Sequence, residues 1–402
     1  MEPHKKKMTR IAIDSELDFQ DVIKFIREKV LKSANDNKDD PSFPIEIFQE
    51  LHKMGWLYAF LPESLGGSGI KTIDLACFSR ELAYASSGVF SSFTVNVLGL
   101  TPILLYGSEE LKKRVCQDFV SHFGLFSYCM TEPDTGTNIT QARTQAKKVP
   151  GGYIINGKKH FITNANFSQH LTVFASLDKG DSQTNLTAFY IPASTKGVSR
   201  GKPLKKLGQR DSNTGELYFD SVFVPEENRI GGEGQGLKIA MHCLQRSKTM
   251  IAAAGVGVCQ RAFDLASDYL ETRKIYPKPL LSFQTIQNQL AQLETQASAA
   301  WLLTCQAANF WENGLNIRDF ALKEASMAKM FSTDVAVHYV SEVLELFGGY
   351  GFTQEFEIER LYRDVRLLEI YEGATLVQQI LISKELFPQM TVRPAIEEKK
   401  AA

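Results

Sequence analysis

The chain has 402 residues, which at about 150 residues per domain predicts two or three domains with a substantial core. Its 45 basic and 46 acidic side chains give a net charge of −1, which argues against a nucleic-acid partner. The longest apolar run, residues 250–259, has ten residues, about half of what a bilayer requires, so no membrane span is expected. The six cysteines are widely spaced, as is typical of reduced thiols in a cytoplasmic protein without disulfides or a zinc site.

The first part of the chain shows a helical period. We expect a flexible N-terminus over residues 1–14 and a helical domain over 15–123, where apolar residues such as Ile47, Leu51 and Met54 recur at helical spacing. A glycine-rich run at 66–69 predicts a turn, and a helix is expected over 72–85.

Between residues 124 and 233 the period changes to two. Residues 153–155 lead into Asn156-Gly157, a pair that predicts a tight hairpin because both residues tolerate positive φ. Further strands are expected at the four runs 171–175, 186–191, 217–219 and 222–224. These short strands predict a central antiparallel β domain, built as a small barrel or sandwich.

The helical period returns over residues 234–388. One segment carries an apolar stripe from Phe283 to Trp301 with spacings of three and four residues, which suits a helix bundle. Residues 389–402 are predicted to form a disordered tail. The expected architecture is therefore an α+β multidomain fold with an N-terminal helical domain, a central antiparallel β domain and a C-terminal four-helix bundle of long segments.

Few residues carry an obvious chemical signature. The sequence contains no Gly-x-Gly-x-x-Gly, phosphate-loop, His-Glu-x-x-His or Gly-x-Ser-x-Gly motif, and its histidines lack metal-ligand spacing. The loop at 128–138 is rich in hydroxyls and turn formers, and its backbone N–H groups suit a flat heterocycle or a phosphate. Glu372 lies between apolar Ile370-Tyr371 and Gly373. Taken alone, the first feature is typical of an ordinary loop, and a Glu beside a Gly is typical of a solvated surface residue.

Together, however, the motifs resemble the acyl-CoA dehydrogenase family of flavoproteins over residues 15–387. The matching blocks follow the family order, and they are Leu61-Pro62-Glu63 with 66–69, Tyr128 to Asn138, Phe161-Ile162-Thr163-Asn164, 222–225, Arg273 with Phe283-Gln284, 347–352, and Tyr362-Arg363-Asp364 leading to 370–373.

The resemblance implies an FAD-dependent α,β-dehydrogenation of an acyl thioester. The matching position makes Glu372 the base that removes the α-proton, while the β-hydride passes to the flavin. A free carboxylate is a poor base for such a carbon acid, so burial should raise the pKa of Glu372. The thioester oxygen is expected to accept hydrogen bonds from the Glu372 backbone N–H and a flavin hydroxyl.

The same resemblance implies three sets of binding residues. FAD contacts are expected from Tyr128, Met130, Thr131, Thr137, Phe161, Ile162, Thr163, Ala374, Thr375 and Leu376. The FAD of a neighbouring subunit is expected to meet Arg273, Gln284, Glu345, Phe347, Gly348 and Gly349, which implies a homodimer or homotetramer. Substrate contacts are expected from Thr137, Gln245, Lys248 and Gly373.

Several residues depart from the family pattern. Phe161 replaces a common Trp, Thr137-Asn138 replaces Ser-Asp, and Lys248 stands where many members have an arginine. Glu345 replaces a Gln, and Ala374 and Leu376 replace polar side chains. Ser247 occupies the place where another branch carries its catalytic Glu.

The partners implied are an acyl-CoA or acyl carrier protein thioester and, as acceptor, an electron-transferring flavoprotein. Two other functions are considered on the same fold. One is an oxygen-using acyl-CoA oxidase or flavin monooxygenase, and the other is a non-catalytic family member.

Overall fold

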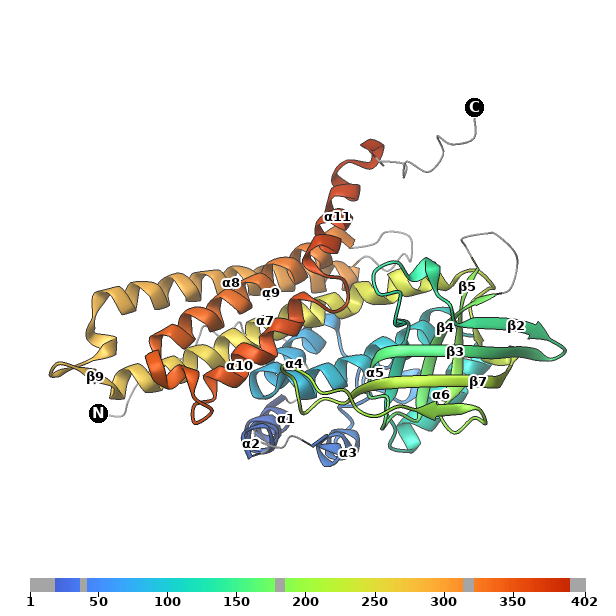
Figure 1. Cartoon of the computed structure of the whole chain (residues 1–402), viewed down its shortest axis with the longest axis horizontal. Helices are drawn as coiled ribbons and strands as arrows, with labels where there is room; N and C mark the ends of the chain where they lie inside the picture. Colours follow the sequence, from blue (N-terminus) through green and yellow to red (C-terminus); the bar gives the residue numbers. More distant parts are fainter. Residues whose placement is uncertain (1–18, 37–41, 178–184, 314–321, 391–402) are drawn as a thin grey trace.

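A computed structural model describes residues 19–36, 42–177, 185–313 and 322–390. The expectations for residues 1–14 and for nearly all of 389–402 lie outside these ranges. A β sheet occupies one end of the molecule, and three long helices extend from it to the other end (Figure 1). The N-terminal helices pack along one side of this assembly. The order helical, β, helical is as expected from the sequence.

The N-terminal part consists of helices whose apolar faces build the main core. They are α1 (Phe19–Phe25), α2 (Leu31–Asp36), α3 (Ile45–Lys53), α4 (Thr72–Ala85), α5 (Ser87–Tyr106) and α6 (Glu109–Ser121). The prediction of a helix over 72–85 is confirmed by α4. Ser86 ends α4 and starts α5, because its hydroxyl accepts a hydrogen bond of 3.0 Å from the backbone N–H of Val89.

Helix α5 is long and apolar enough, by length and composition, to cross a membrane. Its most apolar window has a mean hydropathy of 1.6, but 83% of that window is buried inside the structure. The Thr172 hydroxyl of the sheet donates a 2.6 Å hydrogen bond to the carbonyl of Gly99 in this helix. The apolar character of α5 is therefore accounted for by the protein's own core.

The central part is one eight-stranded sheet. Its strands are β1 (Phe126–Cys129), β2 (Gln145–Val149), β3 (Gly152–Thr163), β4 (His170–Leu177), β5 (Leu186–Pro192), β6 (Val198–Arg200), β7 (Thr214–Pro225) and β8 (Arg229–Ile230). The order is β6-β7-β3-β2-β4-β5-β8, with β1 paired to β4. Most pairs are antiparallel, as expected, but β4 pairs in parallel with both β1 and β2.

The hairpin prediction at Asn156-Gly157 is wrong. These residues lie inside β3, and the turn between β2 and β3 is at Pro150-Gly151, where Gly151 has φ 79°. Asn156 and Gly157 instead form a bulge against β7, in which the Asn156 side chain accepts a 2.7 Å hydrogen bond from the N–H of Ser221. A Cβ at Gly157 would lie 2.6 Å from the Thr144 hydroxyl, so a close approach explains this glycine.

Strand β7 also differs from expectation. The runs 217–219 and 222–224 were expected as separate strands, but they belong to one strand of 12 residues. Ser221 between them has φ 52°, and the local pairing with β3 shifts there. An irregularity inside a continuous strand therefore produced the pattern of two short ones.

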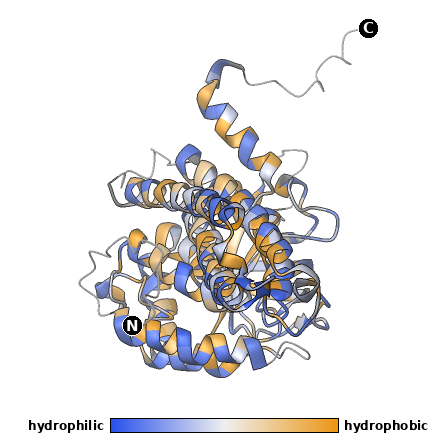
Figure 2. Cartoon of the chain, turned by 90° about the vertical axis from the view of Figure 1, so that its left-hand side faces the viewer, coloured by the Kyte–Doolittle hydropathy of each residue, from blue (hydrophilic) through white to orange (hydrophobic). Residues whose placement is uncertain are grey.

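The C-terminal part is helical, as expected, but its helices differ in length. Three are long: α7 (Gly236–Thr272), α8 (Gln284–Asn313) and α9 (Leu322–Leu346). Two shorter helices, α10 (Ile358–Val365) and α11 (Thr375–Leu386), take the place of a fourth long one. A small hairpin of β9 (Lys274–Ile275) and β10 (Lys278–Pro279) joins α7 to α8. Helix α11 projects away from the remaining chain in both Figures 1 and 2.

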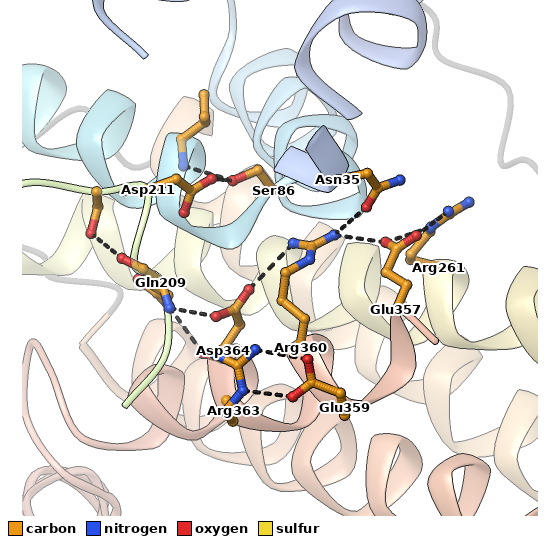
Figure 3. A network of polar contacts seen from close by, with 12 residues as sticks. Asn35, Ser86, Gln209, Asp211, Arg261, Glu357, Glu359, Arg360, Arg363 and Asp364 are labelled. Atoms are coloured by element: carbon orange, nitrogen blue, oxygen red, sulfur yellow. Dashed lines mark hydrogen bonds and ion pairs between the residues drawn. The ribbon is translucent and has the colours of Figure 1, made fainter. Parts of the chain in front are cut away.

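A buried polar network joins the three parts (Figure 3). Arg360 of α10 donates hydrogen bonds to Asn35 of α2 at 3.1 Å and to Glu357 at 2.8 Å. Asp364, also on α10, accepts a hydrogen bond from the backbone N–H of Gln209. The side chain of Gln209 in turn accepts a 2.7 Å hydrogen bond from Ser91 of α5. Because its members come from all three parts, this network fixes α10 and the segment after it relative to the sheet.

Candidate active site

Glu372 lies in a tight turn between α10 and α11. Its φ is 51° and that of Gly373 is 95°, so two consecutive residues adopt the left-handed conformation. Residues other than glycine rarely adopt a positive φ, and backbone strain of this kind concentrates at functional sites. The Tyr371 hydroxyl, 3.4 Å from that of Ser91, connects the turn to the polar network of Figure 3.

The carboxylate of Glu372 points into the protein. The Ser247 hydroxyl of α7 donates a hydrogen bond to it. Burial raises the pKa of Glu372 to about 7, against the opposing effects of the Ser247 hydrogen bond and of the Lys329 and Lys248 ammonium groups. A carboxyl with a pKa near neutrality can accept a proton from a weak acid and release it again.

The two strands β1 and β3 bring the expected flavin-contacting residues side by side. The backbone N–H of His160 donates a 2.9 Å hydrogen bond to the Thr131 carbonyl, and the Ser127 hydroxyl donates one of 2.8 Å to the Thr163 carbonyl. A bulge in β3 gives Phe161 a φ of 55° and leaves its ring 62% exposed. The bulge therefore turns an aromatic ring outward beside the 130–131 loop. The side chain of Ile162, unlike the exposed ring of Phe161, packs in the core of the sheet.

A buried ion pair holds the loop after β1. The Lys159 ammonium lies 2.7 Å from the Glu132 carboxylate and donates a 3.1 Å hydrogen bond to the Met130 carbonyl. Glu132 also accepts hydrogen bonds from the N–H groups of Arg143 and Thr144, at 2.6 and 3.0 Å. Although burial opposes ionisation of Glu132, Lys159 and these donors lower its pKa. The pair fixes the path of the loop from its underside.

Several buried polar atoms of these elements and of α7 have no hydrogen-bond partner within the described ranges. Among them are the Tyr128 hydroxyl, the Thr135 hydroxyl and the Gln245 amide oxygen. Buried polar groups are normally paired, so such atoms indicate a missing partner with donors and acceptors of its own. Burial raises the pKa of Tyr128, and the charges of Cys243 and Glu372 raise it further. A polar, flat cofactor with a substrate beside it fits these residues.

A second group of expected residues lies at the far end of the bundle. Ser247 and Thr272 are 25 residues apart in α7 (272 − 247), which at about 1.5 Å per residue separates them by about 37 Å. Arg273 follows Thr272, is exposed, and places its guanidinium 5.2 Å from the centre of the Tyr350 ring. Gln284 and Glu345 are exposed as well.

The segment 347–349 belongs to the same end. The Phe347 ring is buried and stacks on Tyr269 with centroids 4.2 Å apart. A Cβ added at Gly348 or Gly349 would meet nothing within 4 Å, so this backbone borders open space. The structure therefore divides the expected FAD contacts between two distant places on one chain.

The remaining expected residues lie in different surroundings. Thr137 is exposed in the loop after β1, and Gln245 is buried on α7. Lys248 is buried and donates a 3.2 Å hydrogen bond to the Ser326 hydroxyl of α9. Ala374 and Leu376 are exposed, with Thr375 half-buried between them.

Several contacts of the site escaped the sequence analysis. The sequence marks Ser247 only by the absence of a glutamate, and it predicts no role for Lys329 or Gln378. Lys329 could have been noticed, because it shares one face of α9 with Ala325, Ala328 and Ser332, all of them small and buried. A lysine on such a face requires a specific partner.

The comparisons with known proteins agree with this arrangement. Three family models match in order: the acyl-CoA dehydrogenase N-terminal domain over residues 15–122, the middle domain over 127–222 and the C-terminal domain over 234–387. An acyl-CoA dehydrogenase of Bacillus subtilis (strain 168) is 35% identical over 363 residues, covering 90% of this chain and 95% of that protein.

Solved structures are similar over nearly their whole length. The butyryl-CoA dehydrogenase of Megasphaera elsdenii has a TM-score of 0.88 at 32% identity, covering 93% of this chain and all of that one (100%). The prolyl acyl carrier protein oxidase AnaB has a TM-score of 0.85 at 28% identity, covering 91% and 97%. The chain therefore belongs to the acyl-CoA dehydrogenase family and is an FAD-dependent oxidoreductase.

Proposed function

We propose that the protein removes the α- and β-hydrogens of an acyl thioester, with Glu372 as the base. The observation that carries this proposal is the half-buried carboxylate of Glu372, which accepts a hydrogen bond from Ser247 of α7 and has a pKa raised to about 7. Such a carboxylate is matched to proton abstraction near neutral pH. The family membership supports the same reaction class.

In this mechanism the Cα–H bond of the substrate breaks and its proton passes to a Glu372 carboxylate oxygen. The electron pair left at Cα forms the Cα=Cβ bond as a hydride leaves Cβ. When bound, FAD supplies the acceptor for that hydride. The Ser247 hydroxyl keeps the Glu372 carboxylate oriented, since it fixes one of the two oxygens by a hydrogen bond.

The turn also offers a donor for the thioester oxygen. In the part of the chain that the structure describes, the Glu372 N–H donates to no backbone carbonyl. The carbonyls of Glu372 and Gly373 accept hydrogen bonds from Gln378 instead, at 3.3 and 2.7 Å. With its carbonyls held on one side, the turn leaves the Glu372 N–H available for negative charge that develops on the thioester oxygen.

Substrate contacts are proposed at Thr137, Gln245, Lys248 and Gly373. Gln245 has the strongest support, because its amide oxygen, on the helix that carries Ser247, is buried and has no hydrogen-bond partner among the described residues. Lys248 contributes as a buried positive charge beside Glu372 rather than as a solvent-facing group. We assign the carrier as CoA or an acyl carrier protein, and an electron-transferring flavoprotein as acceptor.

Each FAD site is proposed to need two chains. Arg273, Gln284, Glu345 and the 347–349 segment are too far along the bundle to join Glu372 of the same chain, so they would serve a neighbouring copy. Helix α11 supports such an assembly. Among its residues only Gln378 is buried, while Leu376, Ile380 and Leu386 are 67%, 46% and 55% exposed. A homodimer or homotetramer would cover this apolar surface.

The test is a panel of acyl-CoA and acyl carrier protein thioesters mixed anaerobically with the FAD-loaded protein. Loss of flavin absorbance with formation of the 2-enoyl thioester is the expected result. Rapid oxygen consumption by the substrate-reduced protein would instead favour an oxidase, a chemistry found in the name of one similar structure. If no thioester bleaches the flavin, the dehydrogenase proposal fails.

A further inference from the structure

A buried lysine donates hydrogen bonds to the backbone of the turn that carries Glu372. Lys329 of α9 has no exposed surface, and its ammonium donates hydrogen bonds to the carbonyls of Glu369 at 3.1 Å and Gly373 at 2.9 Å. These two carbonyls lie on either side of Glu372 in sequence. A single side chain from another helix thus bridges the start and the end of the turn.

The turn needs such a support because of its own conformation. Glu372 and Gly373 both have positive φ, so the chain leaves helical geometry and its carbonyls lose their helical partners. Gln378 supplies one set of donors, and Lys329 supplies the other. Hydrogen bonds from a charged donor are the stronger kind, which makes the ammonium the firmer of the two supports.

The charge of Lys329 acts on the same carboxylate. Burial lowers the pKa of Lys329 to about 8, although Glu372 and Glu369 oppose that change. Lys329 is therefore mostly cationic at neutral pH, and it lowers the pKa of Glu372. Besides Glu372, the titratable and charged groups around this region come from the elements packed against it. They are Lys248 on α7, Lys329 on α9, Tyr128 on β1, Glu369 and Tyr371 in the turn, and Glu385 on α11.

We propose that Lys329 is a positioning residue for the base Glu372, holding the turn through two carbonyls and favouring the ionised carboxylate. The proposal rests on the assignment of Glu372 as the base. Lys248 has a different position, because its ammonium donates to Ser326 on α9 and to none of the turn's carbonyls in the described ranges. Of these two lysines, only Lys329 has both a positive charge that acts on Glu372 and hydrogen bonds to the backbone of the turn.

The test compares three variants of the FAD-loaded enzyme. Lys329→Met removes both the charge and the donors with little change in volume. Gln378→Leu removes uncharged donors to the same turn. Lys323→Met removes a charge from the same helix, where the ammonium of that lysine pairs with the Glu324 carboxylate at 3.4 Å. For each variant, flavin reduction by a thioester is measured by stopped flow across pH. The carboxyl band of Glu372 is titrated by infrared spectroscopy, and it is identified by subtracting the spectrum of Glu372→Gln.

The expected results separate the effect of the Lys329 charge from the effect of its hydrogen bonds to the turn. In the parent the carboxyl should titrate near 7, and in Lys329→Met its midpoint should rise by about one pH unit. Reduction at the high-pH plateau should also fall about tenfold or more, because a misaimed base transfers the proton poorly. Gln378→Leu should slow reduction without moving the midpoint, and Lys323→Met should do neither.

An unchanged infrared midpoint in Lys329→Met, or an unchanged plateau rate, would overturn the proposal. If Lys329→Met does not fold, Lys329→Gln keeps a donor without the charge and should show the raised midpoint alone. Failure of the base assignment is read separately. In that case Glu372→Gln reduces its flavin normally, while the infrared titration still reports whether Lys329 acts on Glu372.

Discussion

The hydroxyl of Ser247 donates a hydrogen bond to the carboxylate of Glu372, across 125 positions of sequence. Ser247 lies on α7, and Glu372 lies in the turn before α11. The contact stabilises the ionised carboxylate and opposes the effect of burial on the pKa of Glu372. A residue of α7 therefore helps to set the strength of the proposed base in a turn that lies far along the chain.

Ser247→Ala should make Glu372 a base that ionises at higher pH. A hydrogen bond to a charged group is typically worth about 1.5–3 kcal/mol, or about one to two pKa units, so the acid limb of flavin reduction should move from about 7 to roughly 8–9. Below pH 7 the rate should then fall by at least about tenfold. Stopped-flow pH profiles measure this. Ser332→Ala is the matched control, because that buried hydroxyl donates to the Ala300 carbonyl instead, at 3.3 Å. Identical profiles for Ser247→Ala and the parent would contradict the prediction.

Glu372→Gln should keep bound FAD and thioester binding but lose reduction by at least about a hundredfold, the usual scale for a positioned base. An amide has no basic oxygen at neutral pH, yet it fills nearly the same space. Anaerobic mixing with a thioester measures the reduction rate. Glu372→Asp is the control, since a shorter carboxylate should retain part of the rate. A Gln variant as fast as the parent would place the base elsewhere.

Arg273→Ala should release FAD and shift the oligomer toward smaller species. Arg273 is exposed at the end of α7 that lies away from Glu372, where a guanidinium can bind the pyrophosphate of a neighbouring copy's FAD. Flavin content and sedimentation velocity measure the two effects. The neighbouring exposed Lys274→Ala serves as the control. Full flavin with unchanged size in the Arg273 variant would remove this assignment.

Glu345→Gln should tighten FAD binding, and more so at low salt. Glu345 is exposed, and its carboxylate would repel the negatively charged end of FAD if it faces that end. Salt screens this repulsion least at low ionic strength. Ala374 and Leu376 add no polar side chain to FAD, so part of the purified parent should be colourless. Titration of apoprotein with FAD at two ionic strengths measures this, with exposed Glu355→Gln as control. Equal or weaker affinity in the Glu345 variant would show that this carboxylate is neutralised or points elsewhere.

Lys159→Met should destabilise the protein by about 3–5 kcal/mol, because it leaves the Glu132 charge buried and unpaired. The loop at 130–135 should loosen with it, since Lys159 also bonds to the Met130 carbonyl. Denaturant unfolding followed by circular dichroism measures the loss. The double variant Lys159→Met/Glu132→Gln should recover part of the stability, and no recovery would mean that the pair does not act as one unit.

The amino-acid sequence by itself determined the order of the architecture. Periods of three to four, then two, then three to four residues correctly divided the chain into helical, β and helical parts, because each period reflects which side chains face a core. The helix expected from about residue 72 to residue 85 is present as α4 (Thr72–Ala85). The blocks around residues 131, 163 and 372 also pointed to the family.

Only the tertiary structure decided the local pairing and the surroundings of Glu372. Asn156-Gly157 reads as a hairpin from local preference, but pairing with β7 uses the same two residues for a bulge. The contacts of Glu372 with Ser247 and of its turn with Lys329 join residues separated by 125 and 44 positions. Such contacts depend on how α7, α9 and the turn pack together, and burial by that packing raises the pKa of Glu372 to about 7. Local sequence specifies which residues can form a helix or a turn, whereas the electrostatics of a buried group are set by neighbours that only folding brings near.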